Sequence, residues 1–370
     1  MGPYPHNAPP ATISAANPAG LDGFEFVEFA HPDPQVLEGL FRRMGFIPVA
    51  KHKTKAIALW RQGEVNFLAN SEPGSQAIEF AAKHGPCASS MAWRVVDAQH
   101  ALAHAVANGA APSDVPAAAR ALDTPAIIGI GGSLLYFVDR YRDDQTPYDA
   151  EFDWLGERDP KPAGAGLHYV DHLTHNVHRG RMDVWSRFYE RLFGFREIRY
   201  FDIEGKMTGL FSRAMTSPDG KIRIPINESA DDRSQIEEYL RRYDGEGIQH
   251  VACGARDIYA TVDQLRANGL AFMPPPPSAY YERTEQRLAR HGEPLERLAE
   301  RGILIDGEAV ADGGTTKVLL QIFSATVLGP IFFEFIQRKG DDGFGEGNFR
   351  ALFESIEEDQ IRRGVLEAPR

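Results

Sequence analysis

The chain has few cysteines, no long apolar run and no excess of positive charge. Only two of its 370 residues are cysteines, Cys87 and Cys253. Two cysteines cannot form the disulfide framework of a small secreted domain, and so low a count is typical of proteins in a reducing compartment. No apolar stretch approaches the roughly 20 residues that span a bilayer. We therefore expect a cytoplasmic protein that does not enter a membrane.

The net charge of -12 excludes another class of partner, because a chain this acidic repels the phosphate backbone of nucleic acids. Hydrophobic residues make up 43% and charged residues 25% of the chain, as is typical of a soluble globular protein. Residues 1–20 are rich in proline and alanine and lack a basic segment followed by an apolar one. This is not the pattern of a secretory signal, and we expect a disordered N-terminal arm.

Two blocks of the sequence resemble each other. In each, a short strand pattern (residues 24–30 and 169–174) leads into an amphipathic helix pattern (residues 34–44 and 182–192) that closes on Gly-Phe. A glycine directly after a helix is a common stop signal. Each block therefore predicts a strand, a helix and a sharp turn.

The likeness continues further along the chain. Residues 85–97 match residues 245–257, each a strand that leads into a helix. Residues 135–140 match residues 333–338, each an apolar strand that ends in a polar residue and an arginine. Because an internal repeat is the signature of a duplicated architecture, we predict an α+β protein of two related domains.

We place the first domain at residues 21–150, a polar linker rich in Pro and Gly at residues 151–166, and the second domain at residues 167–370. The second domain carries an insertion between Gly269 and Leu319, with a charged helix pattern over residues 283–301. An insertion of this length is usually a functional cover or an assembly surface. A glycine-rich turn and a helix pattern from Asn348 to about Arg363 follow the last strand.

Three polar residues of the second domain have no polar metal-binding counterpart in the first. The alignment of the two copies pairs His172 with about Phe29, His250 with Ser90, and Glu334 with Tyr136. Two imidazoles and one carboxylate thus occur together in one copy and are absent together from the other. Such a matched set indicates a metal site that only the second domain retains.

Strand periodicity predicts which side chains accompany these three. Successive residues of a strand face opposite sides of the sheet. Each candidate then shares its face with two neighbours: Val170 and Thr174 with His172, Ile248 and Ala252 with His250, and Phe332 and Ile336 with Glu334. If these faces line one barrel interior, a metal ion offsets the cost of burying the polar groups. Two histidines and one carboxylate leave positions open for a chelating substrate and O₂, as in non-haem Fe(II) oxygenases.

The alternatives are ordinary structural roles. A single strand histidine is more often a hydrogen-bonded core residue than a ligand, whereas an acid such as Glu334 inside an apolar strand rarely stays buried without a partner. His168, His175 and His178 occupy the same segment as His172. His175 has the opposite strand parity, His178 falls in a predicted turn, and His168 lies at the start of the strand. The pattern therefore favours His172.

At these residues the sequence resembles the 4-hydroxyphenylpyruvate dioxygenase family. The likeness extends over residues 21–366 and is densest in six segments: residues 170–177, 224–228, 245–252, 319–323, 332–338 and 343–349. The resemblance implies a vicinal-oxygen-chelate fold, with two open-barrel domains of paired βαβββ modules and a C-terminal helix. It agrees with the internal repeat.

The resemblance also implies a site. His172, His250 and Glu334 would bind one Fe(II) per chain, with O₂ as co-substrate. Catalytic roles are implied for three amide side chains, those of Gln249, Gln321 and Asn348. Substrate contacts are implied for seven residues: Ser212, Asn227, Gln235, Phe323, Phe332, Phe344 and Phe349. For the phenylalanines, the alternative is plain core packing.

The activity implied is oxidative decarboxylation, ring hydroxylation and side-chain migration that convert 4-hydroxyphenylpyruvate to homogentisate and CO₂, in tyrosine and phenylalanine catabolism. A dimer or tetramer and a tail helix that acts as a lid are implied as well. The alternatives are 4-hydroxymandelate synthase, extradiol cleavage of a catechol with the same ligands, and a non-catalytic protein that binds small molecules.

Overall fold

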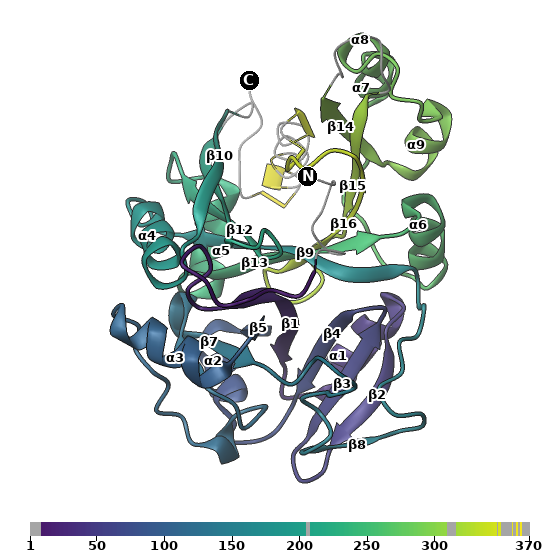
Figure 1. Cartoon of the computed structure of the whole chain (residues 1–370). Coiled ribbons are helices and arrows are strands. Elements are labelled where there is room, and N and C mark those ends of the chain that lie inside the picture. Colours follow the sequence, from purple (N-terminus) through teal and green to yellow (C-terminus); the bar gives the residue numbers. More distant parts are fainter. Residues whose placement is uncertain are drawn as a thin grey trace.

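Two eight-stranded sheets form the two halves of the computed structural model, the first below and the second above in Figure 1. The structure describes residues 9–204, 208–308, 316–345, 347–348, 357, 360–361 and 363–364. The strand order is β6-β7-β5-β1-β4-β3-β2-β8 in the first sheet and β10-β11-β12-β9-β13-β16-β15-β14 in the second.

The first half contains these elements in chain order: β1 (Leu21–Ala30), α1 (Pro34–Arg43), β2 (Ile47–His52), β3 (Ile57–Gln62), β4 (Val65–Asn70), α2 (Gln76–His84), β5 (Cys87–Val95), α3 (Ala98–Ala107), the 3-10 turn η2 (Ala117–Ala119), β6 (Ala126–Ile128), the 3-10 turn η3 (Ile130–Gly132), β7 (Leu134–Val138) and β8 (Phe152–Trp154). Aspartates begin α1 and α3, because the side chains of Asp33 and Asp97 accept hydrogen bonds from free backbone amides of the first turn.

The second half contains β9 (Leu167–Val177), α4 (Met182–Phe193), β10 (Arg196–Glu204), β11 (Gly209–Thr216), β12 (Arg223–Ser229), α5 (Gln235–Tyr243), β13 (Gly247–Ala255), α6 (Ile258–Ala267), α7 (Ser278–Glu282), α8 (Thr284–Arg287), α9 (Leu295–Arg301), β14 (Leu304–Glu308), β15 (Lys317–Phe323) and β16 (Phe332–Lys339). None of the helices that the structure describes has both the length and the apolarity needed to cross a membrane.

The strand pairing repeats from one half to the other. In the first sheet, β1 pairs in parallel with β4 and antiparallel with β5, which pairs in parallel with β7. In the second sheet, β9 pairs in parallel with β12 and antiparallel with β13, which pairs in parallel with β16. The internal repeat and the fold class that the sequence predicts are confirmed.

The strand register corrects one of the three predicted counterparts. In the second sheet, Ala252 lies beside His172 on one side and Glu334 on the other. At the equivalent place in the first sheet the three neighbours are Phe26, Ala92 and Tyr136. The counterpart of His172 is therefore Phe26, and the prediction of Phe29 is wrong.

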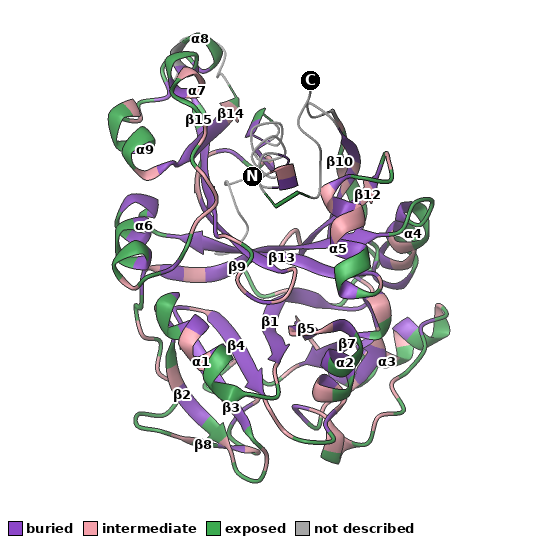
Figure 2. Ribbon diagram, turned by 180° about the vertical axis from the view of Figure 1, so that it is seen from behind, coloured by how far each residue is buried: buried purple, intermediate pink, exposed green. Residues whose placement is uncertain are grey.

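One apolar core joins the two halves. Phe29 and Phe67 of the first sheet lie with their ring centroids 5.8 and 6.0 Å from that of Phe333 in the second. All three rings are fully buried. Figure 2 shows the strands of this region as buried, with the paired strands β9 and β13 above β1 of the first sheet. Burial of so much apolar surface between the sheets stabilises their arrangement.

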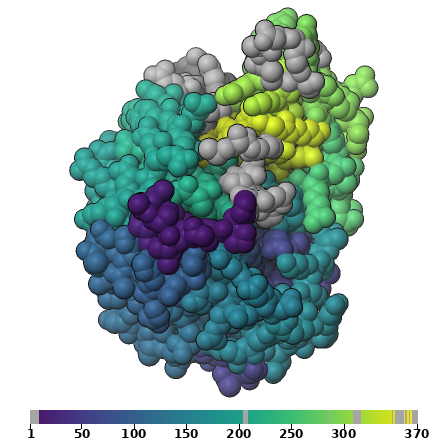
Figure 3. Space-filling model, in the orientation of Figure 1, coloured from purple at the N-terminus to yellow at the C-terminus, as the bar shows by residue number. Residues whose placement is uncertain are grey.

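The N-terminal segment and the linker differ from the prediction. The Asn17 side chain makes two hydrogen bonds to the backbone of Leu21. Its Oδ1 accepts from the Leu21 amide and its Nδ2 donates to the Leu21 carbonyl, both at 2.9 Å. Figure 3 shows this purple segment along the boundary between the halves. A disordered arm is thus wrong for residues 9–20, and residues 1–8 lie outside the described residues. The predicted linker contains β8, which pairs with β2.

The insertion is also more broken than its charge pattern predicts. Instead of one helix over residues 283–301, the structure has two, α8 and α9, and the short helix α7 comes before them. The break lies where Arg290 adopts a positive φ of 63° and Gly292 one of 73°, just before Pro294. Proline lacks an amide hydrogen and a positive φ is incompatible with a right-handed helix, so no helix can continue through this point.

Candidate metal centre

Three neighbouring strands bring the predicted ligands together. His172 comes from β9, His250 from β13 and Glu334 from β16, and all three are buried. The Nε2 atoms of the two histidines lie 3.4 Å apart, and Glu334 Oε2 lies 3.2 Å from His172 Nε2 and 3.5 Å from His250 Nε2. Among the described residues, this is the group of His, Cys, Asp and Glu side chains arranged to hold a metal.

The three ligand atoms form a nearly equilateral triangle. The centre of such a triangle lies at the side divided by √3, about 2 Å from each corner, and metal–N and metal–O bonds measure roughly 2.0–2.2 Å. An ion on the axis of this triangle would contact all three atoms and keep its other side open. Two histidines and one carboxylate on a single face suit Fe(II). The residues therefore fit the metal that the resemblance implies.

A β-bulge lies immediately before the first ligand. His172 pairs with Ala252, but Val170 pairs with the adjacent residue Cys253, so Asp171 is an extra residue in β9. A bulge reverses the alternation of side chains. Val170 consequently joins the apolar core on the opposite face from His172, and the prediction that the two share a face is wrong.

A second bulge precedes the second ligand. Ile248 pairs with His175 and His250 pairs with Thr174, so Gln249 is the extra residue in β13. Ile248 therefore also faces away from the cluster, contrary to the prediction. Thr174 does lie on the predicted face, with its hydroxyl 2.9 Å from His250 Nε2.

Both bulge residues contact the ligand that follows them. Asp171 Oδ1 lies 2.8 Å from His172 Nδ1, and Gln249 Oε1 lies 3.1 Å from His250 Nδ1. An oxygen acceptor at Nδ1 keeps the proton on that nitrogen and leaves the Nε2 lone pair for a metal. The bulges therefore set the orientation of both imidazoles.

Asp171 is itself held by Arg338. Both carboxylate oxygens accept from the guanidinium at 2.8 Å, and neither side chain is more than 2% exposed. Burial acts to raise the pKa of Asp171, but the charge of Arg338 holds the pKa well below its usual range. Asp171 is therefore a carboxylate and accepts the proton of His172. The sequence carries no local pattern that predicts this ion pair, although Arg338 ends a repeated strand.

The charges of the cluster favour a cation. Burial acts to raise the pKa of Glu334, but His172 and His250 outweigh burial and lower the pKa to about 2. Burial acts to lower the pKa of both histidines. At His172 the negative charges of Glu334 and Asp171 outweigh burial, so its pKa is raised. At His250 burial outweighs Glu334, so its pKa is lowered. Glu334 therefore stays ionised and offers a negative oxygen between two imidazoles.

A chain of amides leads away from Glu334. Gln321 Nε2 donates to Glu334 Oε1 at 3.2 Å, and Asn348 Nδ2 donates to Gln321 Oε1 at 3.1 Å. The chain ends on Tyr280, whose hydroxyl donates to Asn348 Oδ1 at 2.5 Å. Gln321 therefore contacts Glu334 directly, and Asn348 is linked to Glu334 through Gln321. Tyr280 is far from both in sequence, and no motif marks it.

Aromatic rings enclose the two histidines. Phe332 stacks on His250 with the centroids 4.7 Å apart, and the edge of Phe344 meets His172 at 5.5 Å. Phe323 packs against Phe332 at 6.1 Å. These buried rings exclude water from one side of the cluster. Phe349 lies outside the described residues.

The predicted polar residues Ser212 and Asn227 occupy one row of the sheet. Ser212 pairs with Asn227, which in turn pairs with Asn176 of β9. Asn227 Nδ2 donates to Asn176 Oδ1 at 3.4 Å. The Nδ2 of Asn176 is buried without a hydrogen-bond partner in the described ranges. Sequence reasoning missed Asn176, although its parity matches that of Thr174.

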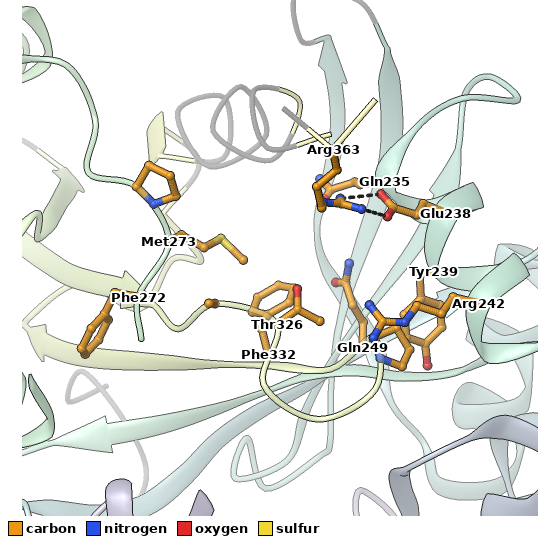
Figure 4. A pocket seen from close by; sticks show the side chains of 13 residues that line it. Gln235, Glu238, Tyr239, Arg242, Gln249, Phe272, Met273, Thr326, Phe332 and Arg363 are labelled. Atoms are coloured by element: carbon orange, nitrogen blue, oxygen red, sulfur yellow. Dashed lines mark hydrogen bonds and ion pairs between the residues drawn. The ribbon is translucent and has the colours of Figure 1, made fainter. Parts of the chain in front are cut away.

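A cavity of about 430 Å³ opens beside the cluster (Figure 4). Gln249 and Phe332 line it, and both contact His250. Gln235, at the start of α5, lines the opposite side, where Arg363 and Glu238 form an ion pair. Of the predicted pocket residues that the structure describes, those that do not line this cavity are Ser212, Asn227, Phe323 and Phe344.

Two family profiles match the chain. One is described as hydroxyphenylpyruvate dioxygenase, N-terminal, and matches residues 15–153. The other is the glyoxalase/bleomycin resistance protein/dioxygenase superfamily, which matches residues 166–290. Together they cover both halves and agree with the repeated fold.

Known proteins resemble the chain over nearly its whole length. A 4-hydroxyphenylpyruvate dioxygenase from Pseudomonas aeruginosa is 58% identical over 96% of this chain and 99% of its own length. One from Legionella pneumophila is 52% identical over 95% and 98%.

Solved structures share the fold. A fusion of a xylose isomerase-like TIM barrel with a 4-hydroxyphenylpyruvate dioxygenase has a TM-score of 0.77 and 30% identity over 97% of this chain and 54% of that one. A triple mutant of 4-hydroxymandelate synthase from Streptomyces coelicolor has a TM-score of 0.76 and 25% identity over 92% of this chain and 99% of that one. The chain belongs to the 4-hydroxyphenylpyruvate dioxygenase family.

Proposed function

We propose that this chain is an Fe(II)-dependent enzyme that converts 4-hydroxyphenylpyruvate and O₂ to homogentisate and CO₂. The observation that carries the proposal is the triangle of His172, His250 and Glu334, which has ligand types and spacing suited to Fe(II). Iron bound there would supply the activation of dioxygen, which no amino-acid side chain can supply.

The surrounding side chains would bind and orient the substrate. The amide groups of Gln249 and Gln321 contact the cluster, and that of Asn348 contacts Gln321. Amide N–H groups can donate hydrogen bonds to the carboxylate and keto oxygens of a 2-oxo acid. Phe332 and Phe344 offer apolar faces that keep water away. The adjoining cavity, about 430 Å³, lies in the usual size range of small-molecule sites. A substrate contact of Ser212 and Asn227, which do not line this cavity, rests on the family resemblance alone.

The C-terminal segment would act as a lid. Its described residues are tied to the rest of the second half: Gln360 Nε2 donates to Glu238 at 2.9 Å, Arg363 donates to the same carboxylate at 2.5 and 3.0 Å, and Glu357 accepts from the amide and hydroxyl of Thr208. Truncation before Gly343 should abolish turnover that couples O₂ uptake to product. Full activity after truncation would exclude a lid.

The decisive experiment measures Fe(II)-dependent O₂ uptake with 4-hydroxyphenylpyruvate and identifies the product by chromatography. His172→Ala and Glu334→Ala should each abolish both signals. A matched control is His175→Gln, which alters a buried histidine of the same strand whose ring binds Tyr189 on the opposite face. Activity that survives in either ligand variant would overturn the proposal.

The product distinguishes the nearest alternative. 4-Hydroxymandelate would identify the chain as a synthase of the kind that its structural neighbour represents. The 58% identity to a 4-hydroxyphenylpyruvate dioxygenase favours homogentisate. A yellow ring-cleaved product from a catechol would indicate extradiol chemistry, and binding without O₂ uptake would indicate a non-catalytic protein.

Two properties of the whole protein complete the proposal. We expect a cytoplasmic protein, since both cysteines are free and buried. We also expect a homo-oligomer, a dimer or tetramer, as the family resemblance implies. Cell fractionation tests the first expectation, and light scattering of the purified chain tests the second.

A further inference from the structure

The insertion of the second half lies next to residues 347–348, at the start of the C-terminal segment proposed as a lid. Its strand β14 extends the sheet by pairing with β15, and Leu304 of β14 lies opposite Gln321. Figure 1 shows α7, α8 and β14 grouped at one end of the second sheet. Three residues of the insertion contact this segment where it begins.

The first contact is made by Tyr280 of α7. Its hydroxyl donates to Asn348 Oδ1 at 2.5 Å and accepts from the Ile305 amide at 2.8 Å and from Arg287 at 3.3 Å. Burial raises the pKa of Tyr280 to about 12, so the hydroxyl keeps its proton at neutral pH. This proton also lies within reach of the Ile305 carbonyl at 2.9 Å, and the shorter separation of 2.5 Å favours Asn348 Oδ1 as its acceptor.

The second contact runs through an ion pair. Arg287 donates to Asp306 Oδ1 at 3.0 Å, and Asp306 Oδ2 accepts from the backbone amide of Gly347 at 2.6 Å. Arg287 also donates to the Ile305 carbonyl at 2.5 Å. The insertion therefore binds both the side chain of Asn348 and the backbone directly before it.

Two glycines allow this close approach. A Cβ atom on Gly345 would lie 1.9 Å from Gln321 Oε1, and φ at this residue is +76°. A Cβ atom on Gly347 would lie 2.3 Å from an Arg287 nitrogen and 2.5 Å from Asp306 Oδ1. Separations this short are never seen for real Cβ atoms, so the turn is shaped to fit against Gln321 and the Arg287–Asp306 pair.

We propose that Tyr280, Arg287 and Asp306 form a latch that fastens residues 347–348 to the insertion and thereby positions Asn348 against Gln321, which contacts Glu334. The three are positioning residues, because they act on the site only through Asn348, Gln321 and the backbone. The link to catalysis rests on the proposed function; the contact itself does not.

The test compares Tyr280→Phe with Tyr281→Phe in the full-length, iron-loaded protein. Both variants remove one tyrosine hydroxyl from a neighbouring position of α7. The hydroxyl of Tyr281 has no hydrogen-bond partner among the residues that the structure describes, so its loss should be silent. In Tyr280→Phe, loss of the hydrogen bond to Asn348 alone should raise the rate of hydrogen exchange at residues 340–348 roughly 2- to 10-fold, and loss of the hydrogen bonds to Ile305 and Arg287 adds to this increase.

The second measurement is the ratio of homogentisate formed to O₂ consumed. Tyr280→Phe should lower this ratio while Tyr281→Phe keeps the wild-type value, and Asp306→Asn should behave like Tyr280→Phe. A purely structural role would lower the melting temperature and leave the ratio unchanged, and that result would overturn the proposal.

The exchange measurement separates the two proposals. It needs no turnover, so it tests the latch even if the wild-type chain made no homogentisate, an outcome that would overturn only the proposed function. Equal exchange at residues 340–348 in Tyr280→Phe and Tyr281→Phe would overturn the latch while leaving the proposed function intact.

Discussion

Asp171→Asn separates two roles of one buried carboxylate. The substitution keeps the shape of the side chain and removes its charge, so His172 loses an anionic acceptor and Arg338 loses its counter-ion. Both partners are buried: the exposed fraction of the side chain is 0% for Asp171 and 2% for Arg338. Breaking a buried ion pair on one side costs about 3–5 kcal/mol, and losing the partner of a metal-bound histidine weakens metal binding about 10- to 100-fold.

Arg338→Gln is the matched variant. It breaks the same ion pair but leaves the Asp171 carboxylate on His172 Nδ1. Urea titration of the apo-protein should therefore show a similar loss of stability in both variants. Anaerobic competition with a chelator should show a large loss of Fe(II) affinity in Asp171→Asn and a smaller one in Arg338→Gln. Equal Fe(II) affinities in the two variants would refute the assignment of Asp171 as the residue that orients His172.

Three further predictions follow from the geometry and the charges. A chelator should abolish O₂ uptake, and one equivalent of Fe(II) per chain should restore it. Zn(II) should not restore uptake, because it has no redox chemistry. Uptake that persists in the presence of the chelator would contradict metal dependence. Phe29→Ala should lower the free energy of unfolding by about 3–5 kcal/mol in urea titration, because the ring is buried between both halves; a loss below about 1 kcal/mol would argue against the shared core. Asp219→Asn should stabilise the protein more above about pH 7 than near pH 4, because burial raises the pKa of Asp219 from 3.8 to about 6. As the pH rises through that value, ionisation of Asp219 in the folded state costs up to about 3 kcal/mol. An equal gain in stability at both pH values would contradict the raised pKa.

The sequence was sufficient to predict the repeat, because strand and helix periods and the glycine stops recur in both halves. It was also sufficient to predict that His172, His250 and Glu334 lie together, since an acid in an apolar strand and two strand histidines are unusual enough to stand out. The structure brings these three side chains within hydrogen-bonding distance of one another.

Strand register was the main source of error. The segment of residues 24–30 alternates in a way that fits the second copy at more than one offset, and the offset was three residues wrong at Phe29. Bulges have no clear signal in the residues themselves, so Val170 and Ile248 were placed on the wrong face. By contrast, the helix break before Pro294 carries a signal, because glycine and proline interrupt the charged pattern there.

Long-range contacts could not be read from local patterns at all. Arg338 lies 167 positions from Asp171, and Tyr280 lies 68 positions from Asn348. Such pairs are defined only by the folded sheet, because neither partner has a local periodicity that points to the other. Asn176 is the exception, since its parity with His172 and Thr174 places it on the face of the cluster.

The central claim is that one Fe(II) bound by His172, His250 and Glu334 acts on 4-hydroxyphenylpyruvate. The most direct test is an anaerobic titration of the apo-protein with Fe(II), followed by addition of substrate and air and measurement of homogentisate at each step. Homogentisate formation should rise linearly to one Fe(II) per chain and then level off, and Glu334→Ala should give none. Product formation that is independent of added Fe(II), or that survives in Glu334→Ala, would contradict the account.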